Sequence, residues 1–128
     1  MFPKLEVTRM AQALAAHAGT RQGVVAANIA QADTPGYRAR DLPSFAEVWQ
    51  DGASSGLVAT RSGHLSGSSG SSGGTARQTT DAASPDGNSV SLEREMVRAA
   101  EVRTQHDMAL SVYRSVSDVI RASLGRTR

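Results

Sequence analysis

The stretch NIAQADTPGYRARD, residues 28–41, decides the fold, because it ends a helical segment abruptly. Pro35 disfavours the helical conformation at Thr34 and lacks the N–H that a continuing helix needs. Pro35 and Gly36 suit the two central positions of a type II turn, in which Gly36 takes a positive φ. The stretch therefore predicts a helix that stops at a tight turn.

The polar residues around this turn predict how the chain continues. Asn28 and Asp33, on the last helical turns, are placed to hydrogen-bond exposed backbone groups. We expect the Tyr37 ring to fold back onto the helix, and Arg38 and Arg40 to reach neighbouring carboxylates. Taken alone, the same residues fit a generic helix stop followed by a loop equally well.

Residues 4–33 are predicted to form the helix that this turn ends, and Pro3 suits its start. Gly19 and Gly23 lie inside it, and each costs about 1 kcal/mol relative to alanine. The helix is therefore marginal alone and needs a packing partner. Its apolar stripe, of period 3.6 and mostly alanine, consists of Ala11, Leu14, Ala18, Val25, Ile29 and Ala32.

Residues 91–124 carry the stronger helical pattern. Ser91 suits the N-cap, Glu93 and Glu95 lie in the first turn, and Gly125 suits the stop. Such a helix would be about 50 Å long. A heptad seam is formed by Leu92, Met96, Ala99, Arg103, His106, Leu110, Tyr113, Ser117, Ile120 and Leu124. A second stripe, which predicts contacts on another side, is formed by Val102, Ala109, Val112, Val116 and Val119.

The segment between the two helices differs in kind. From Gly52 to Gly74, 15 of 23 residues are Gly or Ser, a composition that buries too little apolar surface to fold alone. We expect a flexible connector there. The flanking residues 44–49 and 57–60 suit either a short strand pair or a cover over a helix.

These segments predict an all-α fold. Two long helices pair as an antiparallel coiled coil, joined by a long flexible Ser/Gly-rich loop. Residues 1–36 form the N-terminal helix and its turn, residues 37–89 the loop, in which a short β-hairpin has room, and residues 90–128 the C-terminal coiled-coil helix. Neither helix has an apolar face wide enough for a well-packed monomer, so the pattern indicates a piece of an assembly.

Composition argues against most other functions. Thirteen arginines are interleaved with acids rather than gathered on one face, which argues against nucleic-acid binding. No apolar run approaches the roughly 20 residues that span a bilayer, and the first residues lack the pattern of a cleaved secretory signal. The chain has no cysteine, which removes thiolate chemistry and cysteine zinc sites.

No candidate catalytic, cofactor-binding or metal-binding residue emerges. His17, His64 and His106 lie far apart, and we expect them at surface or seam positions. The Gly-rich run lacks the lysine of a phosphate loop, and residues 81–88 lack the terminal glutamate of a calcium loop. We therefore expect no enzyme activity, no cofactor and no small-molecule substrate.

Two motifs together resemble a known family. ANIAQADTPGYRARD, residues 27–41, is similar to the N-terminal signature of the bacterial flagellar axial proteins, which form the rod and hook; Gln31 stands where that family usually has asparagine. DGNSVSLEREMVRAAE, residues 86–101, resembles the family's entry into its C-terminal helix. The matching residues of the first motif are Asn28, Ile29, Ala30, Thr34, Pro35, Gly36 and Tyr37.

The resemblance implies a mechanical role. With only about 50 residues between its motifs, the chain is similar to the small proximal rod proteins, which leave the cell through the flagellar type III export apparatus without a cleaved signal peptide. It implies a structural subunit of the basal-body rod, with itself, other rod proteins, the rod–membrane-ring junction protein and the MS ring as partners. The alternatives are another rod protein of the family, or a stand-alone coiled-coil adaptor that would form a discrete dimer or tetramer.

The residues expected at subunit interfaces come from the turn and from the C-terminal seam. They are Asn28, Ile29, Thr34, Pro35, Gly36, Tyr37, Arg38, Arg40, Leu92, Met96, Leu110, Tyr113, Ile120 and Leu124.

Overall fold

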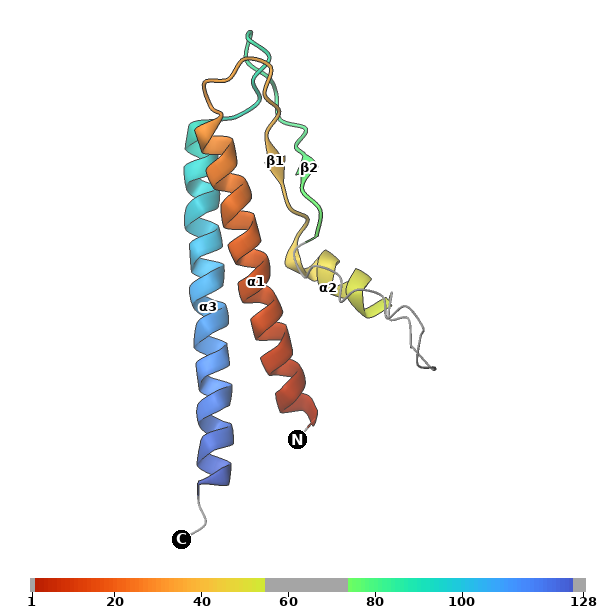
Figure 1. Cartoon of the computed structure of the whole chain (residues 1–128), viewed down its shortest axis with the longest axis vertical. Helices are drawn as coiled ribbons and strands as arrows, with labels where there is room; N and C mark the ends of the chain where they lie inside the picture. The colour runs from red at the N-terminus through yellow and green to blue at the C-terminus, as the bar shows by residue number, and fades with distance from the viewer. Residues whose placement is uncertain (1, 55–73, 126–128) are drawn as a thin grey trace, which may run out of the picture.

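The computed structural model describes residues 2–54 and 74–125 of the chain. Two long helices, α1 (Phe2–Ala30) and α3 (Leu92–Leu124), lie side by side and run in opposite directions (Figure 1). Between them come the short strand β1 (Arg40–Asp41), the helix α2 (Phe45–Ser54) and the short strand β2 (Arg77–Gln78). The mostly helical fold with two long packed helices is confirmed.

Helix α1 ends where the sequence predicts a turn. Its last residue is Ala30, and Gly36 has a φ of 74°. The Tyr37 N–H donates to the Thr34 carbonyl oxygen over 3.3 Å, which closes the predicted turn around Pro35 and Gly36. The chain then reverses and returns along α1.

Small side chains pack between the two long helices. Ala11, Ala18 and Val25 of α1 are buried, as are Val102 and Ala109 of α3. Because these side chains are short, the helix backbones approach closely, and little apolar area is buried per turn. The apolar core of this hairpin is therefore narrow.

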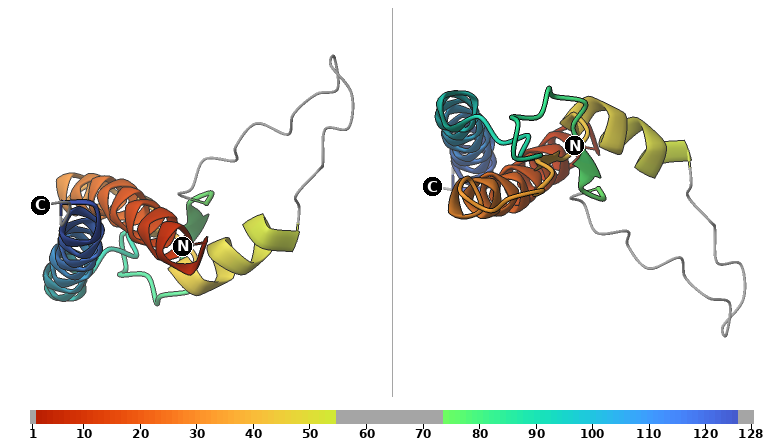
Figure 2. Two further views of the ribbon diagram at one scale, coloured as in Figure 1. Left: turned by 90° about the horizontal axis from the view of Figure 1, so that it is seen from below. Right: turned by 90° about the horizontal axis from the view of Figure 1, so that it is seen from above.

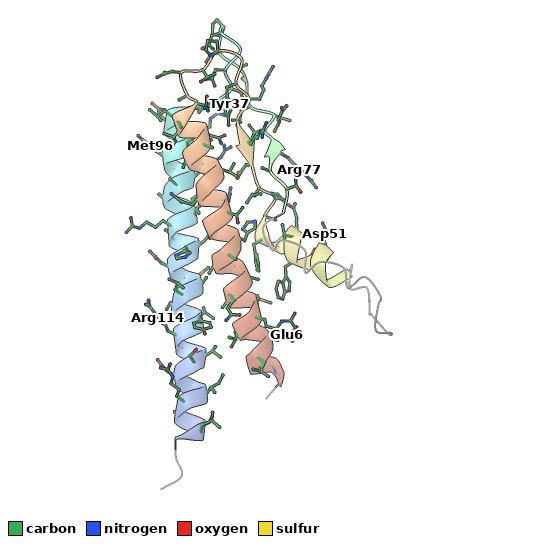
Figure 3. The ribbon with its side chains drawn as sticks, viewed as in Figure 1. Glu6, Tyr37, Asp51, Arg77, Met96 and Arg114 are labelled. Atoms are coloured by element: carbon green, nitrogen blue, oxygen red, sulfur yellow. The ribbon has the colours of Figure 1, made fainter. Side chains whose placement is uncertain are left out.

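The predicted heptad seam of α3 does not lie at the centre of the contact with α1, and its residues range from half-buried to exposed. Leu92, Met96 and Leu124 are 46%, 60% and 66% exposed, and Met96 points away from α1 (Figure 3). Of the second stripe, Val102 and Ala109 are buried at the centre of the contact instead, whereas Val112 and Val119 are 40% and 50% exposed. The physical reason is that α1 offers alanines rather than large holes, and that a buried carboxylate at Glu95 fixes which face of α3 turns inward.

The chain between the turn and α2 forms a strap, residues 38–44, and the chain after the connector forms a return segment, residues 75–83. Arg40 pairs with Gln78 and Asp41 with Arg77 in an antiparallel ladder. The strands and α2 lie on the side of α1 that faces away from most of α3 (Figure 2).

Residues 45–54 form helix α2 rather than a strand, and α2 contacts α1 near its start before it leads away from α1 (Figure 1). The Phe45 ring packs edge-on against His17, with ring centroids 5.8 Å apart, and is 5.6 Å from the Trp49 ring. His17 Nε2–H donates to the Pro43 carbonyl oxygen over 3.0 Å. His17 is therefore buried beneath the strap, contrary to the surface or seam position expected for it.

Most of the predicted Ser/Gly connector, and residues 57–60 with it, lie outside the described residues. His64 lies outside them too. At the edge of the connector, Gly74 has a φ of 64°, and a Cβ there would lie 3.0 Å from Val48 Cγ2. Only glycine fits this position without displacing Val48.

Candidate functional site

A buried asparagine closes the end of α1. The Asn88 side chain is 3% exposed, and its Nδ2 donates to the carbonyl oxygens of Gln31 at 3.0 Å, Ala32 at 2.7 Å and Thr34 at 3.0 Å. These carbonyl oxygens belong to the turn of residues 31–34, directly after Ala30, the last residue of α1. Asn88, which lies in the segment before α3, therefore holds the chain where it leaves α1.

The segment that carries Asn88 also holds the turn. Gly36 N–H donates to the Asp86 carbonyl oxygen over 3.0 Å, and Ser89 N–H donates to the Tyr37 carbonyl oxygen over 3.0 Å. The Ser89 hydroxyl accepts from the Ala39 N–H at 2.8 Å. Residues 27–41 and 86–101, the two sequence motifs, therefore meet in one hydrogen-bonded structure.

Two glycines allow this contact. Gly36 and Gly87 have φ values of 74° and 84°, which β-carbon-bearing residues rarely adopt. A Cβ on Gly87 would lie 3.3 Å from the Gly36 Cα. The two backbones come close because Gly87 has no side chain, whereas a Cβ on Gly36 would meet no atom within 4 Å, so that glycine is favoured by its positive φ alone.

Asn28 joins the turn to both helices. Its Oδ1 accepts from the Arg40 N–H at 3.1 Å and from the Tyr37 hydroxyl at 3.3 Å. Its Nδ2 donates to the Arg40 carbonyl oxygen at 2.7 Å and to Glu95 Oε2 at 3.0 Å. Both the oxygen and the nitrogen of this buried amide are therefore hydrogen-bonded. With Arg40, the amide exchanges two hydrogen bonds with one backbone residue, as a paired strand residue does.

A cluster of charged residues continues below Asn28. Arg21 binds Asp41 through two parallel hydrogen bonds of 2.8 Å and 2.7 Å. Arg98 bonds to the buried Glu95, with Nη1 2.5 Å from Oε1, and also lies near Asp41, at 3.8 Å. We call Arg21, Asp41, Asp81, Arg94, Glu95 and Arg98 the charge cluster.

Asp81 brings the return segment into the cluster. Its carboxylate lies 2.7 Å from Arg94 Nη1 and 3.4 Å from Arg98 Nη2. Three acids thereby face three arginines, drawn from α1, the strap, the return segment and α3. When one member of such a set of paired charges is removed, its partner is left as a partly buried, unpaired charge, which lowers the stability of the fold.

The environment keeps these groups charged. Burial works against the Asp41 carboxylate, but the hydrogen bonds and charge of Arg21 outweigh it, so the pKa of Asp41 lies below its ordinary value. A hydrogen bond from Thr79, followed by the charges of Arg94 and Arg98, lowers the pKa of Asp81. The hydrogen bond to Asp41 raises the pKa of Arg21.

The pKa of Arg98 is raised as well. Burial opposes its charge, and the charge and hydrogen bond of Glu95 outweigh that effect.

Comparison with known proteins identifies the family. The chain is 32% identical over 116 residues to the flagellar basal body rod protein FlgB of Agrobacterium fabrum, covering 87% of each chain. It is 35% identical to FlgB of Salmonella typhimurium, over 72% of this chain and 73% of that protein. It is 38% identical to FlgB of Escherichia coli, over 71% of this chain and 72% of that protein. The chain belongs to the FlgB family. No family model matches it.

Membership of the FlgB family confirms the resemblance to the flagellar axial proteins and makes the chain a structural protein of the flagellar basal body rod. At the one departure from the signature, the Thr34 hydroxyl donates to Gln31 Oε1 over 2.6 Å, so the longer amide still reaches a partner in the turn.

The residues predicted from the signature fall into two groups in this FlgB-family chain. Asn28 is buried and Tyr37 is half-buried, with its hydroxyl folded back onto α1 as expected. Thr34, Pro35 and Gly36 are exposed at the tip of the turn. Tyr37 lies beside that tip (Figure 3).

The remaining predicted residues lie at the surface. Within the described part of the chain, Arg38 and Arg40 are exposed and form no ion pair, so the expectation that they reach nearby carboxylates is wrong for the isolated chain. Asp41, the carboxylate beside them, is already bound by Arg21. Ile29 is 36% exposed, and Leu110, Tyr113 and Ile120 are half-buried along α3.

Sequence reasoning missed the role of Asn88, Ser89 and Glu95. Glu95 lies seven and fourteen residues before the buried Val102 and Ala109, on the same face of α3. A carboxylate in register with apolar seam positions signals a buried polar partner on the facing helix, and Asn28 is that partner.

The described residues contain no group of three His, Cys, Asp or Glu side chains that could hold a metal ion. None of the helices in residues 2–54 and 74–125 is apolar and long enough to cross a membrane.

Proposed function

We propose that the chain is a structural subunit of the proximal rod, which polymerises into the drive shaft that connects the membrane ring to the distal rod and hook. The observation that carries this proposal is the meeting of the two motifs. Together they form a hydrogen-bonded structure at one end of the helical hairpin, and they leave the tip of the turn exposed.

The contacts within the chain support a mechanical role. Hydrogen bonds and ion pairs fix the turn, the strap and both helices relative to one another, which suits a part that transmits torque. The apolar core, by contrast, is narrow, and large apolar side chains stay exposed on both long helices. A subunit that completes its packing against neighbours has these two properties.

The subunit interfaces that we propose use the surfaces left open. The exposed turn residues Thr34, Pro35 and Gly36, with Arg38 and Arg40, would contact one neighbour, and Asn28 and Tyr37 would hold this surface in place from beneath. Leu92, Met96 and Leu124 would contact others. Ile29, Leu110, Tyr113 and Ile120, only partly covered in the single chain, would be covered further on assembly, as the two helices extend their pairing into a coiled coil.

The proposed partners are further copies of this chain, other rod proteins, the rod–membrane-ring junction protein and the MS ring. The chain would reach the periplasm-spanning rod through the flagellar type III export apparatus, without a cleaved signal peptide, and would have no enzymatic role. Heterologous contacts that do not pair off in twos would build a helical tube.

Electron microscopy of basal bodies from a strain that lacks the gene tests this proposal, together with a swimming assay. Membrane rings without a rod, restored by the intact gene, would support a proximal position. Truncated rods would move the chain to a more distal position, as another rod protein. Intact flagella would overturn the proposal and favour the coiled-coil adaptor, which sedimentation should then show as a discrete dimer or tetramer.

A further inference from the structure

One side of the α1–α3 pair is hollowed. A groove of about 700 Å³ lies between the helices, and its floor includes the small residues Ala18 and Gly19 of α1 and Ala99 and Ala100 of α3. A Cβ built on Gly19 meets no atom within 4 Å, so the groove is open there. The exposed Arg103 side chain stands on its α3 rim.

A different face of α3 carries an unpartnered apolar stripe. Val97, Met108, Val112 and Val119 are 60%, 54%, 40% and 50% exposed, and helical spacing places them on one side of the helix. Exposed Glu101 lies within this stripe. At 3.6 residues per turn, Met108 and Arg103 point in directions roughly 140° apart around α3.

We infer that the α3 stripe of one copy docks in the α1–α3 groove of the next, with Glu101 of the first copy facing Arg103 of the second. The small residues on the groove floor let a helix approach closely, and the valines and methionine of the stripe have the size to fill the hollow. Glu101 and Arg103 carry opposite charges, and within the described residues neither makes an ion pair of its own. Asp107 also lines the groove, so the pairing that we propose is specific to Arg103 on the rim. The negative charge of Glu101 adds to those that raise the pKa of Arg21, but without a hydrogen bond between the two side chains.

The geometry of the two faces decides the kind of assembly. Stripe and groove are different surfaces, so the contact is heterologous and each copy keeps one free groove and one free stripe. The stripe and the groove rim point in directions roughly 140° apart around α3. Because these directions are neither equal nor opposite, each copy is rotated relative to the one before it, and the copies do not form a flat row. This inference rests on the proposed function and names the surfaces through which the subunits associate.

Cross-linking of introduced cysteines tests the contact, because the chain has no cysteine of its own. One full-length chain carries Met108→Cys in the stripe, and a second carries Gly19→Cys in the groove. Mixed under oxidation, they should form a disulfide-linked heterodimer. A matched control replaces Gly19→Cys by Thr20→Cys, the next residue of α1, which is exposed and directed away from the groove.

Charge reversal supplies a second, independent test. Glu101→Arg or Arg103→Glu alone places like charges against each other in every contact between identical copies, and should weaken association roughly tenfold or more. A mixture of the two variants should recover it, because each stripe then finds an opposite charge in the other variant's groove.

The outcomes separate this inference from the proposed function. Equal cross-linking of Gly19→Cys and Thr20→Cys, or no recovery in the mixture, would overturn the stripe-in-groove contact. If the gene deletion still removes the rod, the rod assignment stands and only the contact surfaces are wrong. Selective cross-linking together with recovery in the mixture would establish the contact.

Discussion

The amide nitrogen of Asn88 lies 2.7 Å from the carbonyl oxygen of Ala32, 56 residues earlier in the chain. This bond, with the two that Asn88 makes to Gln31 and Thr34, ties the end of α1 to the start of α3. A local turn would depend on neighbouring residues alone. Here the three bonds form only when the segment before α3 lies against the end of α1, so the turn acquires its shape as part of the hairpin.

Asn88→Ala should therefore destabilise the whole hairpin. Removing the amide takes away the donor of the Ala32 carbonyl oxygen and one of the two donors of the Gln31 and Thr34 carbonyl oxygens, which also accept from the Thr34 and Tyr37 N–H groups. We expect a loss of about 1–3 kcal/mol in the free energy of unfolding. Circular dichroism at the helical band, followed through thermal or urea unfolding, measures it. Thr104→Ala is the control: its hydroxyl is exposed and bonds only to Ala100 of its own helix, so the change should stay within about 0.5 kcal/mol. Equal effects of the two substitutions would contradict the role of Asn88.

Two glycines should respond to alanine in opposite directions. Gly87→Ala imposes a Cβ at a φ of 84°, 3.3 Å from the Gly36 Cα, and should cost about 1–3 kcal/mol. Gly23→Ala places a Cβ in open space on a helix, and should stabilise the chain by up to about 1 kcal/mol. The same unfolding measurement on both variants checks the signs. A Gly87→Ala variant as stable as the original chain would show that the two turns need not touch.

The sequence was sufficient to predict the elements that depend on local rules. The break at Pro35 and Gly36, the return of Tyr37 onto the helix, and both long helices follow from turn chemistry and periodicity. The rotation of α3 could not be predicted in this way, because heptad counting favours large residues such as Leu92 and Met96. The packing instead centres on Val102 and Ala109, since α1 offers alanines and Glu95 must reach Asn28.

The hydrogen bonds that Asn88 and Ser89 make to the turn could not be predicted from local sequence rules, for a related reason. Asn88 and Ser89 act on residues about 50 positions away, and nothing in their immediate neighbourhood indicates which carbonyl or N–H they bind. Their partners become known only when the two helices are placed side by side.

Acid should weaken the attachment of the strap. The folded pKa of Asp41 lies below its ordinary value of 3.8, so its contribution to stability is fully present above that value and is lost as pH falls through the lower, folded pKa. The pKa of Asp81 is shifted in the same direction, and its contribution is lost over the same acid range. Hydrogen exchange at the Thr79 amide, which donates to the Ala39 carbonyl oxygen in the strand pair, reports this attachment residue by residue.

Asp41→Asn tests the cause of that acid sensitivity. It leaves Arg21 without its carboxylate at neutral pH, so protection of the Thr79 amide should fall and then change less on acidification than in the original chain. Asp118→Asn, at an exposed carboxylate 3.9 Å from Arg121, should leave this profile unchanged. An Asp41→Asn variant with the original acid profile would move the effect to another group.

Substitution of the turn should separate assembly from export. Replacing Pro35 and Gly36 together by alanine removes the fixed φ and the positive φ that shape the turn, so the surface offered to a neighbour changes. We expect rod assembly to fail while the chain is still exported, measured by basal-body microscopy beside immunodetection of the chain outside the cytoplasm. Normal swimming in such a strain would count against the turn as a subunit contact.

The two free arginines should matter to assembly and not to folding. Arg38→Ala and Arg40→Ala remove exposed side chains that form no ion pair within the described residues, so each should change the free energy of unfolding by less than about 0.5 kcal/mol. If these side chains bind carboxylates of a neighbouring subunit, swimming should decline and the double variant should lack rods. Arg21→Ala is the contrasting control, because it breaks the ion pair with Asp41, in which Arg21 donates two hydrogen bonds. It should therefore lower the free energy of unfolding. A double variant that is stable and swims normally would remove Arg38 and Arg40 from the proposed interface.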